Sequence, residues 1–315
     1  MRKLYIVLLF CFFAYFSEAQ NFMRPNEWKK YRREAFFTIG TSNFLGDLGG
    51  RDKKGTDYLP LDLNLNQSRT ALGFGARYKI QRWLNVAGKF SYLNVRGDDS
   101  VTEDIYRNNR NLNFKSNIYE LAARAEFGYQ STRRGGNKYG IRRNYGRSRN
   151  ITHNLFVFIG IGGFYYNPKG RTPTGEYVAL RPLHTEGQGL PGGPKQYSNI
   201  SISIPVGAYY KVTLNKSWSL GIEFNYRKTF TDYIDDVGSS YYDNNVLRAQ
   251  PGVGELSAQM ADPNLGKIYG FSSPAADGTP AQRGDKQKDA FMSLEFSLSY
   301  TFKKQRKSAR LRSKF

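Results

Sequence analysis

Eight charged residues stand at alternate positions in segments whose other positions are apolar or small. They are Arg77, Lys89, Glu120, Arg124, Glu126, Glu223, Arg227 and Glu295. Carboxylates beside basic groups suit general acid–base catalysis, an ion pathway, or ion pairs that join neighbouring strands. Acid–base catalysis also needs a cleft for a substrate, and nothing in the sequence supplies one. We therefore expect the eight charges to pair with one another as a network inside a narrow fold.

Histidines and glycines offer weaker candidates for chemistry. His153 and His184 lie in predicted connections, and no serine and aspartate pattern accompanies them as in an acyl-transfer triad. Gly160, Gly162 and Gly163 are spaced like part of a phosphate-binding loop, but no helix follows them. We interpret these glycines as part of a strand in a curved wall.

Four aspartates fall within one connection: Asp232, Asp235, Asp236 and Asp243. Carboxylates are good Ca²⁺ ligands, but this spacing is not that of an EF-hand. We expect these side chains to order the connection, and a Ca²⁺ site stays open as the alternative. The sequence indicates no cofactor and no catalytic residue, so we expect a protein that is not an enzyme.

The elements that carry these residues alternate with a period of two, which is typical of strands with one apolar face. Eight predicted strands cover 34–44, 70–80, 84–95, 117–129, 154–166, 199–212, 217–230 and 290–302, and the one at 154–166 is apolar on both faces. Most connections alternate between long and short, as in outer-membrane barrels with tight periplasmic turns. We predict an all-β fold, an eight-stranded antiparallel transmembrane β-barrel like OmpA and OmpX, with long extracellular loops.

A soluble β-sandwich is the alternative, but its core would bury full charges without partners. One feature conflicts locally with a closed ladder, because Pro205 has no N–H to donate. We expect a bulge or a register irregularity at this proline.

The N-terminus predicts export. Arg2 and Lys3 precede an apolar run over 4–16, and Ser17 and Ala19 occupy the small-residue positions of a cleavage site. We predict a cleaved signal peptide at 1–19, a periplasmic segment at 20–33, the barrel at 34–302 and a basic periplasmic tail at 303–315. The predicted location is the outer membrane of a Gram-negative cell, in contact with its lipid. Export disfavours a nucleic-acid partner.

Positive charge is concentrated in two stretches of the chain. The net charge is +21, from 47 Lys and Arg against 26 Asp and Glu. Connection 130–153 and tail 303–315 each hold seven basic and no acidic residues. Such a surface attracts acidic partners or anionic headgroups. We predict a periplasmic docking site in the connection, formed by Arg133, Arg134, Lys138, Tyr139, Arg142, Arg143, Tyr145, Arg147 and Arg149.

The last segment has a pattern similar to the C-terminal signal that the outer-membrane assembly machinery reads. Its residues are Phe296, Leu298, Tyr300 and Phe302. The assembly machinery is therefore an expected partner during biogenesis, although a basic tail follows Phe302.

Three blocks resemble the PorG-type barrel family of the Bacteroidota: residues 43–48 (NFLGDL), 181–189 (RPLHTEGQG) and 231–237 (TDYIDDV). The resemblance runs from about residue 34 to Phe302. It implies a non-enzymatic outer-membrane adaptor of the type IX secretion or gliding machinery that docks periplasmic secretion-ring proteins. The alternative function is a generic barrel for envelope integrity or surface adhesion.

Overall fold

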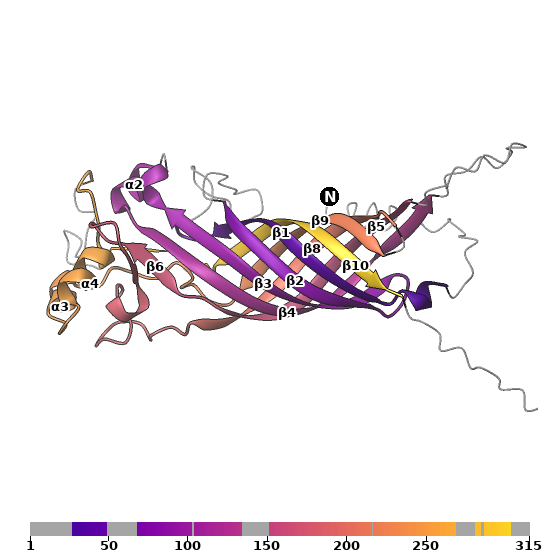
Figure 1. The fold of residues 1–315 in the computed structure, drawn as a ribbon. Helices are drawn as coiled ribbons and strands as arrows, with labels where there is room; N and C mark the ends of the chain where they lie inside the picture. The colour runs from indigo at the N-terminus through magenta and orange to yellow at the C-terminus, as the bar shows by residue number, and fades with distance from the viewer. Residues whose placement is uncertain are drawn as a thin grey trace, which may run out of the picture.

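Eight antiparallel strands close into a barrel in the computed structural model, which describes residues 27–48, 68–102, 104–133, 151–215, 217–268, 281–284 and 287–303. The strands are β1 (Arg33–Leu45), β2 (Arg69–Lys79), β3 (Leu84–Asp98), β4 (Asn113–Arg133), β5 (Ile151–Tyr165), β8 (Ile200–Thr213), β9 (Trp218–Thr229) and β10 (Ala290–Phe302). Each pairs with the next in this order, and β10 pairs with β1 to close the ring (Figure 1). The predicted eight-stranded antiparallel barrel is confirmed.

The barrel wall is apolar outside and polar inside. Along β10, Leu294, Phe296 and Leu298 are largely exposed on the outer surface, whereas Ser293 and Glu295 are buried. Because successive side chains of a strand point to opposite faces, this alternation follows directly from the sequence. The four residues of the predicted assembly signal all belong to the exposed outer row.

Strands β3, β4 and β5 extend beyond the bounds that the sequence predicted. β3 and β4 stay paired up to Asp98 and Asn113, so they form a two-stranded ribbon that extends beyond the end of β2 at one end of the barrel. At the other end, β4 and β5 stay paired out to Arg133 and Ile151, beyond the last pair of β3 with β4 at Leu84. These extensions are rich in polar residues, so apolar alternation gave no signal for them.

Pro205 does not change the register. β5 and β8 pair in one constant register on both sides of the proline, so the predicted bulge or register irregularity is wrong. The ladder is instead interrupted between the pairs Ile159–Val206 and Gly162–Ser203. The pairing of β8 with β9 continues through Pro205 and Arg227. A missing N–H removes bonds to only one neighbour, which explains the one-sided effect.

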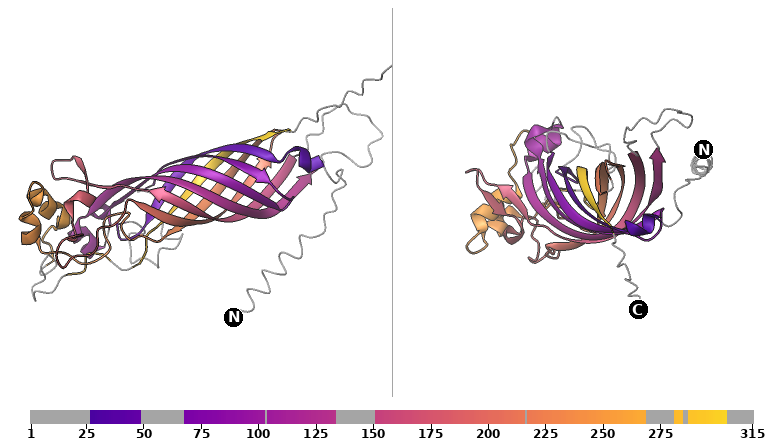
Figure 2. Two further views of the ribbon diagram at one scale, coloured as in Figure 1. Left: turned by 90° about the horizontal axis from the view of Figure 1, so that it is seen from below. Right: turned by 45° about the vertical axis from the view of Figure 1, so that its right-hand side comes forward.

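The long connections fold into short elements at one end of the barrel, which we call the cap. Its elements are η3 (Asp99–Val101), α2 (Ile105–Arg110), β6 (Pro168–Arg171), β7 (Tyr177–Ala179), η4 (Arg181–Leu183), α3 (Asn244–Arg248) and α4 (Gly254–Ala261). Figure 1 shows α2, β6, α3 and α4 together at this end, and Figure 2 shows the same separation of cap and barrel from two other sides.

The short helix η1 (Glu27–Lys30) and the end of β10 lie at the opposite end of the barrel (Figure 1). The two-residue period that predicted the strands gave no signal for such short helices. None of the helices in the described ranges is long and apolar enough to cross a membrane.

Candidate functional site

Ten charged side chains form one continuous network inside the barrel. Basic groups and carboxylates alternate along it in the order Lys211, Glu34, Arg77, Glu126, Arg124, Glu223, Lys89, Glu295, Arg227 and Glu120. None of the ten residues is more than 8% exposed. The five positive and five negative charges cancel, so the network buries no net charge.

The network contains all eight residues that the sequence suggested, and two that it missed. Lys211 stands on the polar face of a predicted strand, and Glu34 is the first residue of another. Their ion pair ties β8 to β1 across the lumen. Both lie near strand ends, where sequence alone does not show whether a charge points into the barrel or into solvent.

Aromatic rings fill the spaces between the charges. The Arg77 guanidinium lies 4.6 Å from the ring centre of Phe36 and 4.4 Å from that of Tyr209. The Arg124 guanidinium lies 4.4 Å from the Phe158 ring on β5. Rings at these distances attract a guanidinium electrostatically. They also explain why β5 looked apolar on both faces in the sequence: its inward side chains complete the cage around the arginines.

An apolar cluster fills the lumen between the charge network and the cap. Phe291 of β10 contacts Phe164 of β5 edge-to-face at 5.5 Å, and Phe44 of β1 contacts Phe114 of β4 at 4.8 Å. Cap residues such as Leu183 belong to the same cluster. Eight strands leave a lumen that side chains can fill, and these do so with charges at one level and rings at the next. This packing suits a structural plug rather than an acid–base site.

Two buried arginines hold the cap together. Arg283 donates from Nη1 to Glu186 Oε1 at 3.0 Å and to the carbonyl oxygen of Asp236 at 2.7 Å. Arg110 donates from Nε to Asp99 Oδ2 at 2.7 Å and from Nη1 to the carbonyl oxygen of Arg283 at 2.6 Å. Each guanidinium thereby ties connections that are far apart in the sequence.

Two aspartates of the predicted cluster accept hydrogen bonds within the cap. Asp235 accepts from the backbone N–H of Leu48 and of Val237, each at 3.1 Å. Asp236 accepts from the Tyr197 hydroxyl at 2.6 Å, and burial raises the pKa of Asp236 to about 6. Burial likewise raises the pKa of Asp235 well above its usual range. These bonds order the connection.

The other two aspartates make different contacts. Asp243 caps α3 by accepting from the N–H of Asn245 at 2.8 Å, and Asp232 lies 3.7 Å from Lys288 Nζ. Across the described ranges, no group of three or more His, Cys, Asp or Glu side chains is placed to hold a metal ion.

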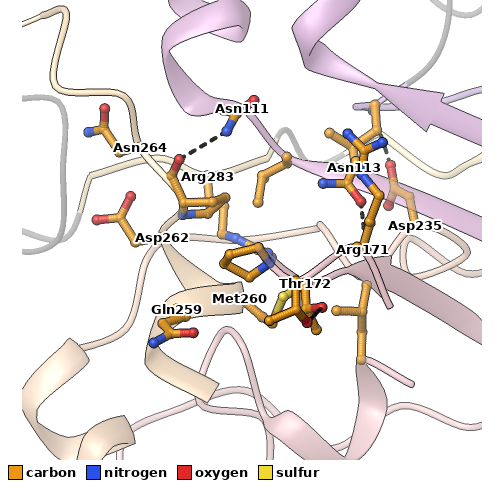
Figure 3. Close-up of a pocket in the computed structure, with 17 residues that line it drawn as sticks. Asn111, Asn113, Arg171, Thr172, Asp235, Gln259, Met260, Asp262, Asn264 and Arg283 are labelled. Atoms are coloured by element: carbon orange, nitrogen blue, oxygen red, sulfur yellow. Dashed lines mark hydrogen bonds between the residues drawn. The ribbon is translucent and has the colours of Figure 1, made fainter. Parts of the chain in front are cut away.

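A cavity of about 620 Å³ opens between the cap elements (Figure 3). Amide, hydroxyl, guanidinium and carboxylate groups line it beside a few apolar side chains. The lining polar residues include Asn111, Asn113, Arg171, Thr172, Gln259 and Asp262. Met260, Leu180 and Pro263 supply apolar surface. The volume lies within the usual range for small-molecule sites.

The cavity draws its walls from the four long connections at the cap end of the barrel. Asn113 Oδ1 accepts from the backbone N–H of Arg171 at 2.7 Å, and Asn111 Nδ2 donates to the carbonyl oxygen of Pro263 at 3.2 Å. No local sequence pattern marks this cavity, because its residues come from connections whose spatial relation depends on the fold.

Most of the predicted docking connection lies outside the described residues. Arg133 is the last residue of β4, and the other eight residues of the predicted docking site fall in 134–150. The signal peptide and residues 304–315 of the basic tail also lie outside the described ranges.

The two histidines lie in different parts of the molecule, one in the barrel wall and one in the cap. His153 lies in β5, not in a connection as predicted, and its Nδ1 is 2.6 Å from the Tyr210 hydroxyl. His184 follows η4 in a left-handed backbone conformation, with its ring beside the carbonyl oxygen of Gln188. Neither histidine lines the cap cavity.

The fold defines the chain as a closed eight-stranded antiparallel β-barrel with a folded cap. No family model matches the chain, and no curated protein matches it.

Solved structures that match include Ail, the attachment invasion locus protein of Yersinia pestis, in complex with the heparin analogue sucrose octasulfate. It has a TM-score of 0.34 and 11% identity, and covers 86% of this chain and 99% of its own. Neisserial surface protein A (TM-score 0.33, 9% identity) covers 86% of this chain and 97% of its own. The outer membrane protein AlkL has a TM-score of 0.28 and 12% identity, and it covers 88% of this chain and 92% of its own.

Proposed function

We propose that this chain is a non-enzymatic outer-membrane barrel that holds a rigid cap at the cell surface to bind a polar ligand. The outer wall of the barrel is an apolar surface that only a bilayer would cover fully. The turns between β2 and β3 and between β8 and β9 are short and lie at the end opposite the cap. In outer-membrane barrels, short turns face the periplasm and long connections face outward.

The cap cavity is the observation that carries this proposal. Buried ion pairs and an apolar core fix the cap, so the cavity is preformed, while charges and rings fill the lumen beneath it. A filled lumen suits recognition better than transport. Amide and guanidinium donors beside carboxylate acceptors suit hydroxyl-rich ligands, and Met260 and Pro263 suit the apolar face of a sugar ring. We therefore propose an oligosaccharide as the ligand.

The single substitutions Arg171→Ser and Gln259→Ala should each weaken oligosaccharide binding by about tenfold or more, because each removes a polar group that would hold the ligand. Both side chains are exposed and lie on different elements, so the cap should stay folded. Binding is measured on a glycan array and then by calorimetry. Arg248→Ser is the control, since Arg248 is an exposed cap residue outside the cavity. Binding that both variants keep at the wild-type level would place the ligand elsewhere.

A secretion-linked adaptor is the second candidate, because the three blocks that resemble the PorG-type family meet in the cap. The N–H of Leu48 donates to Asp235, which joins the first block to the third. Thr185 of the second block donates to Asp236 of the third. The resemblance therefore rests on one structural unit rather than on scattered residues, and it supports a role beside the type IX machinery.

The adaptor role predicts that the connection after β4 docks acidic periplasmic ring proteins. The ribbon of β4 and β5 projects from the end opposite the cap, which aims this connection at the periplasm. Replacing Arg142, Arg143, Arg147 and Arg149 with Ser should reduce capture of ring proteins in crosslinked pull-downs, and added salt should reduce capture by the wild type. Lys169→Ser with Lys195→Ser, in the cap, is the control. Full recovery of every partner by the quadruple variant would leave the connection as a solvated linker.

A further inference from the structure

A second cavity, of about 420 Å³, lies at the end of the barrel opposite the cap. Five basic residues line it: Lys29, Lys30, Arg32, Arg33 and Lys303. Two aromatic residues, Tyr78 and Phe302, complete the described lining, which contains no carboxylate. We call this feature the basic cavity.

The basic cavity lies on the outer wall of the barrel, not in the lumen. Arg33 pairs in register with Tyr78 on β2 and with Phe302 on β10, so the three side chains share one face. The neighbouring Glu34 points into the lumen, where it joins the charge network, and Arg33 therefore points outward. Tyr78 and Phe302 are accordingly 44% and 49% exposed.

Helix η1 folds back beside this row of residues. The Arg32 guanidinium lies 4.9 Å from the ring centre of Trp28, and its Nη1 donates to the Tyr78 hydroxyl at 3.3 Å. The carbonyl oxygen of Arg32 accepts from the N–H of Lys79 at 2.8 Å, which fixes the chain against β2. These contacts hold the basic groups at the barrel wall.

The charges of the basic cavity have no neutralising carboxylate among the side chains that the structure describes. None of its five basic residues forms an ion pair with a side chain in that part of the chain. The Nε of Arg32 is buried and has no hydrogen-bond partner within the described ranges. Like charges held this close repel one another unless an anion lies between them.

Apolar surface continues from the basic cavity along the barrel wall. Ala35 and Ala76 pair next to it, and then Phe37 pairs with Phe74 on one side and Leu298 on the other. All five residues are exposed. An anionic group followed by hydrocarbon is the chemistry of a phospholipid, and basic and aromatic side chains mark the level of lipid headgroups.

We propose that the basic cavity binds the phosphate-bearing headgroup of an anionic phospholipid in the periplasmic leaflet. The proposal rests on the outer-membrane orientation proposed above, which places this end of the barrel at that leaflet. Arg32 and Tyr78 contact the phosphate, Arg33 and Lys303 flank it, and the acyl chains lie along Phe37.

Native mass spectrometry of the barrel extracted from vesicles of phosphatidylcholine with a minor share of phosphatidylglycerol tests the site. The wild type should retain phosphatidylglycerol in excess over its share of the bilayer. The variant Arg32→Ser, Arg33→Ser, Lys303→Ser should lower that enrichment by about tenfold or more, because each basic group near a headgroup strengthens its binding severalfold. The control Lys169→Ser, Lys195→Ser, Lys228→Ser removes as many basic groups at the cap end and should keep the enrichment.

Three results would overturn the proposal in distinguishable ways. Equal enrichment of phosphatidylglycerol in the wild type and in the triple variant of Arg32, Arg33 and Lys303 would mean that the lipid binds elsewhere. Displacement of the lipid by inorganic phosphate alone would mean that the cavity is a site for free anions. A wild-type chain that never enters vesicles as a heat-modifiable band would contradict the membrane barrel itself, and the lipid site with it.

Discussion

Replacing Arg227 with Met is expected to lower the free energy of unfolding of the barrel by about 3–5 kcal/mol, the usual effect of removing one partner of a buried ion pair. Arg227 Nε lies 2.6 Å from Glu120 Oε2, and both residues are almost completely buried. Without Arg227, the Glu120 carboxylate keeps the Ser203 hydroxyl as its one hydrogen-bond donor among the described residues. Urea unfolding of the barrel in lipid vesicles measures the loss.

A second variant separates the cost of a stranded charge from the value of the pair. Arg227→Met with Glu120→Leu leaves four positive and four negative groups in the network, so its charge stays balanced. This double variant should recover most of the lost stability. Arg248→Met breaks an exposed pair with Glu255 and should change stability by about 1 kcal/mol or less. A double variant less stable than Arg227→Met would show that the network does not act through charge balance.

The cap is expected to loosen as the pH rises. Burial raises the pKa of Asp236 from 3.8 to about 6 in the folded cap, even though Arg283 lowers it. Asp236 in the folded cap thus binds a proton that it releases in the unfolded chain, so its contribution to stability is greatest below pH 3.8 and is lost as the pH rises through 6. The difference is about 3 kcal/mol, because one pKa unit corresponds to about 1.4 kcal/mol. Burial shifts the pKa of Asp235 and Asp289 in the same direction.

Hydrogen exchange of cap amides across this pH range, corrected for intrinsic exchange rates, measures the effect. Asp236→Asn cannot ionise at that position, so the pH dependence should become weaker in this variant. The Asn245 N–H, which donates to the Asp243 carboxylate that caps α3, gives an internal comparison near the surface. Protection of the cap that rises with pH would contradict the inferred proton uptake.

Most barrel strands could be predicted from sequence because apolar and polar residues alternate along them over eleven or more residues. Phe296, Leu298 and Tyr300 alternate with Glu295 and smaller polar residues, and only a wall with one apolar side satisfies that pattern. The inward direction of the interior charges could be predicted from the same alternation. Whether Arg124 would meet Glu126 on its own strand or Glu223 on β9 depended on side-chain reach across the lumen, and it contacts both.

The cap could not be predicted in this way. Its helices are short, and its stability comes from contacts such as Arg283 with Glu186 that join residues distant in the sequence. Local signals did exist: Asp104 and Asp243 each precede a helix that they cap. The cavity itself had no local signal, because Asn113, Arg171 and Gln259 converge only after the barrel has closed.

Labelling of single cysteines in intact cells tests the central claim most directly, namely that the barrel spans the outer membrane with its cap outside. The only cysteine of the chain is Cys11, within the predicted signal peptide, so one introduced thiol reports one position. Lys195→Cys places the thiol in the connection before β8, at the cap end, and Gln81→Cys places it in the turn after β2. We expect a membrane-impermeant maleimide to label Lys195→Cys in intact cells and Gln81→Cys only after the outer membrane is permeabilised. Labelling of Gln81→Cys in intact cells with Lys195→Cys protected would contradict the proposed orientation.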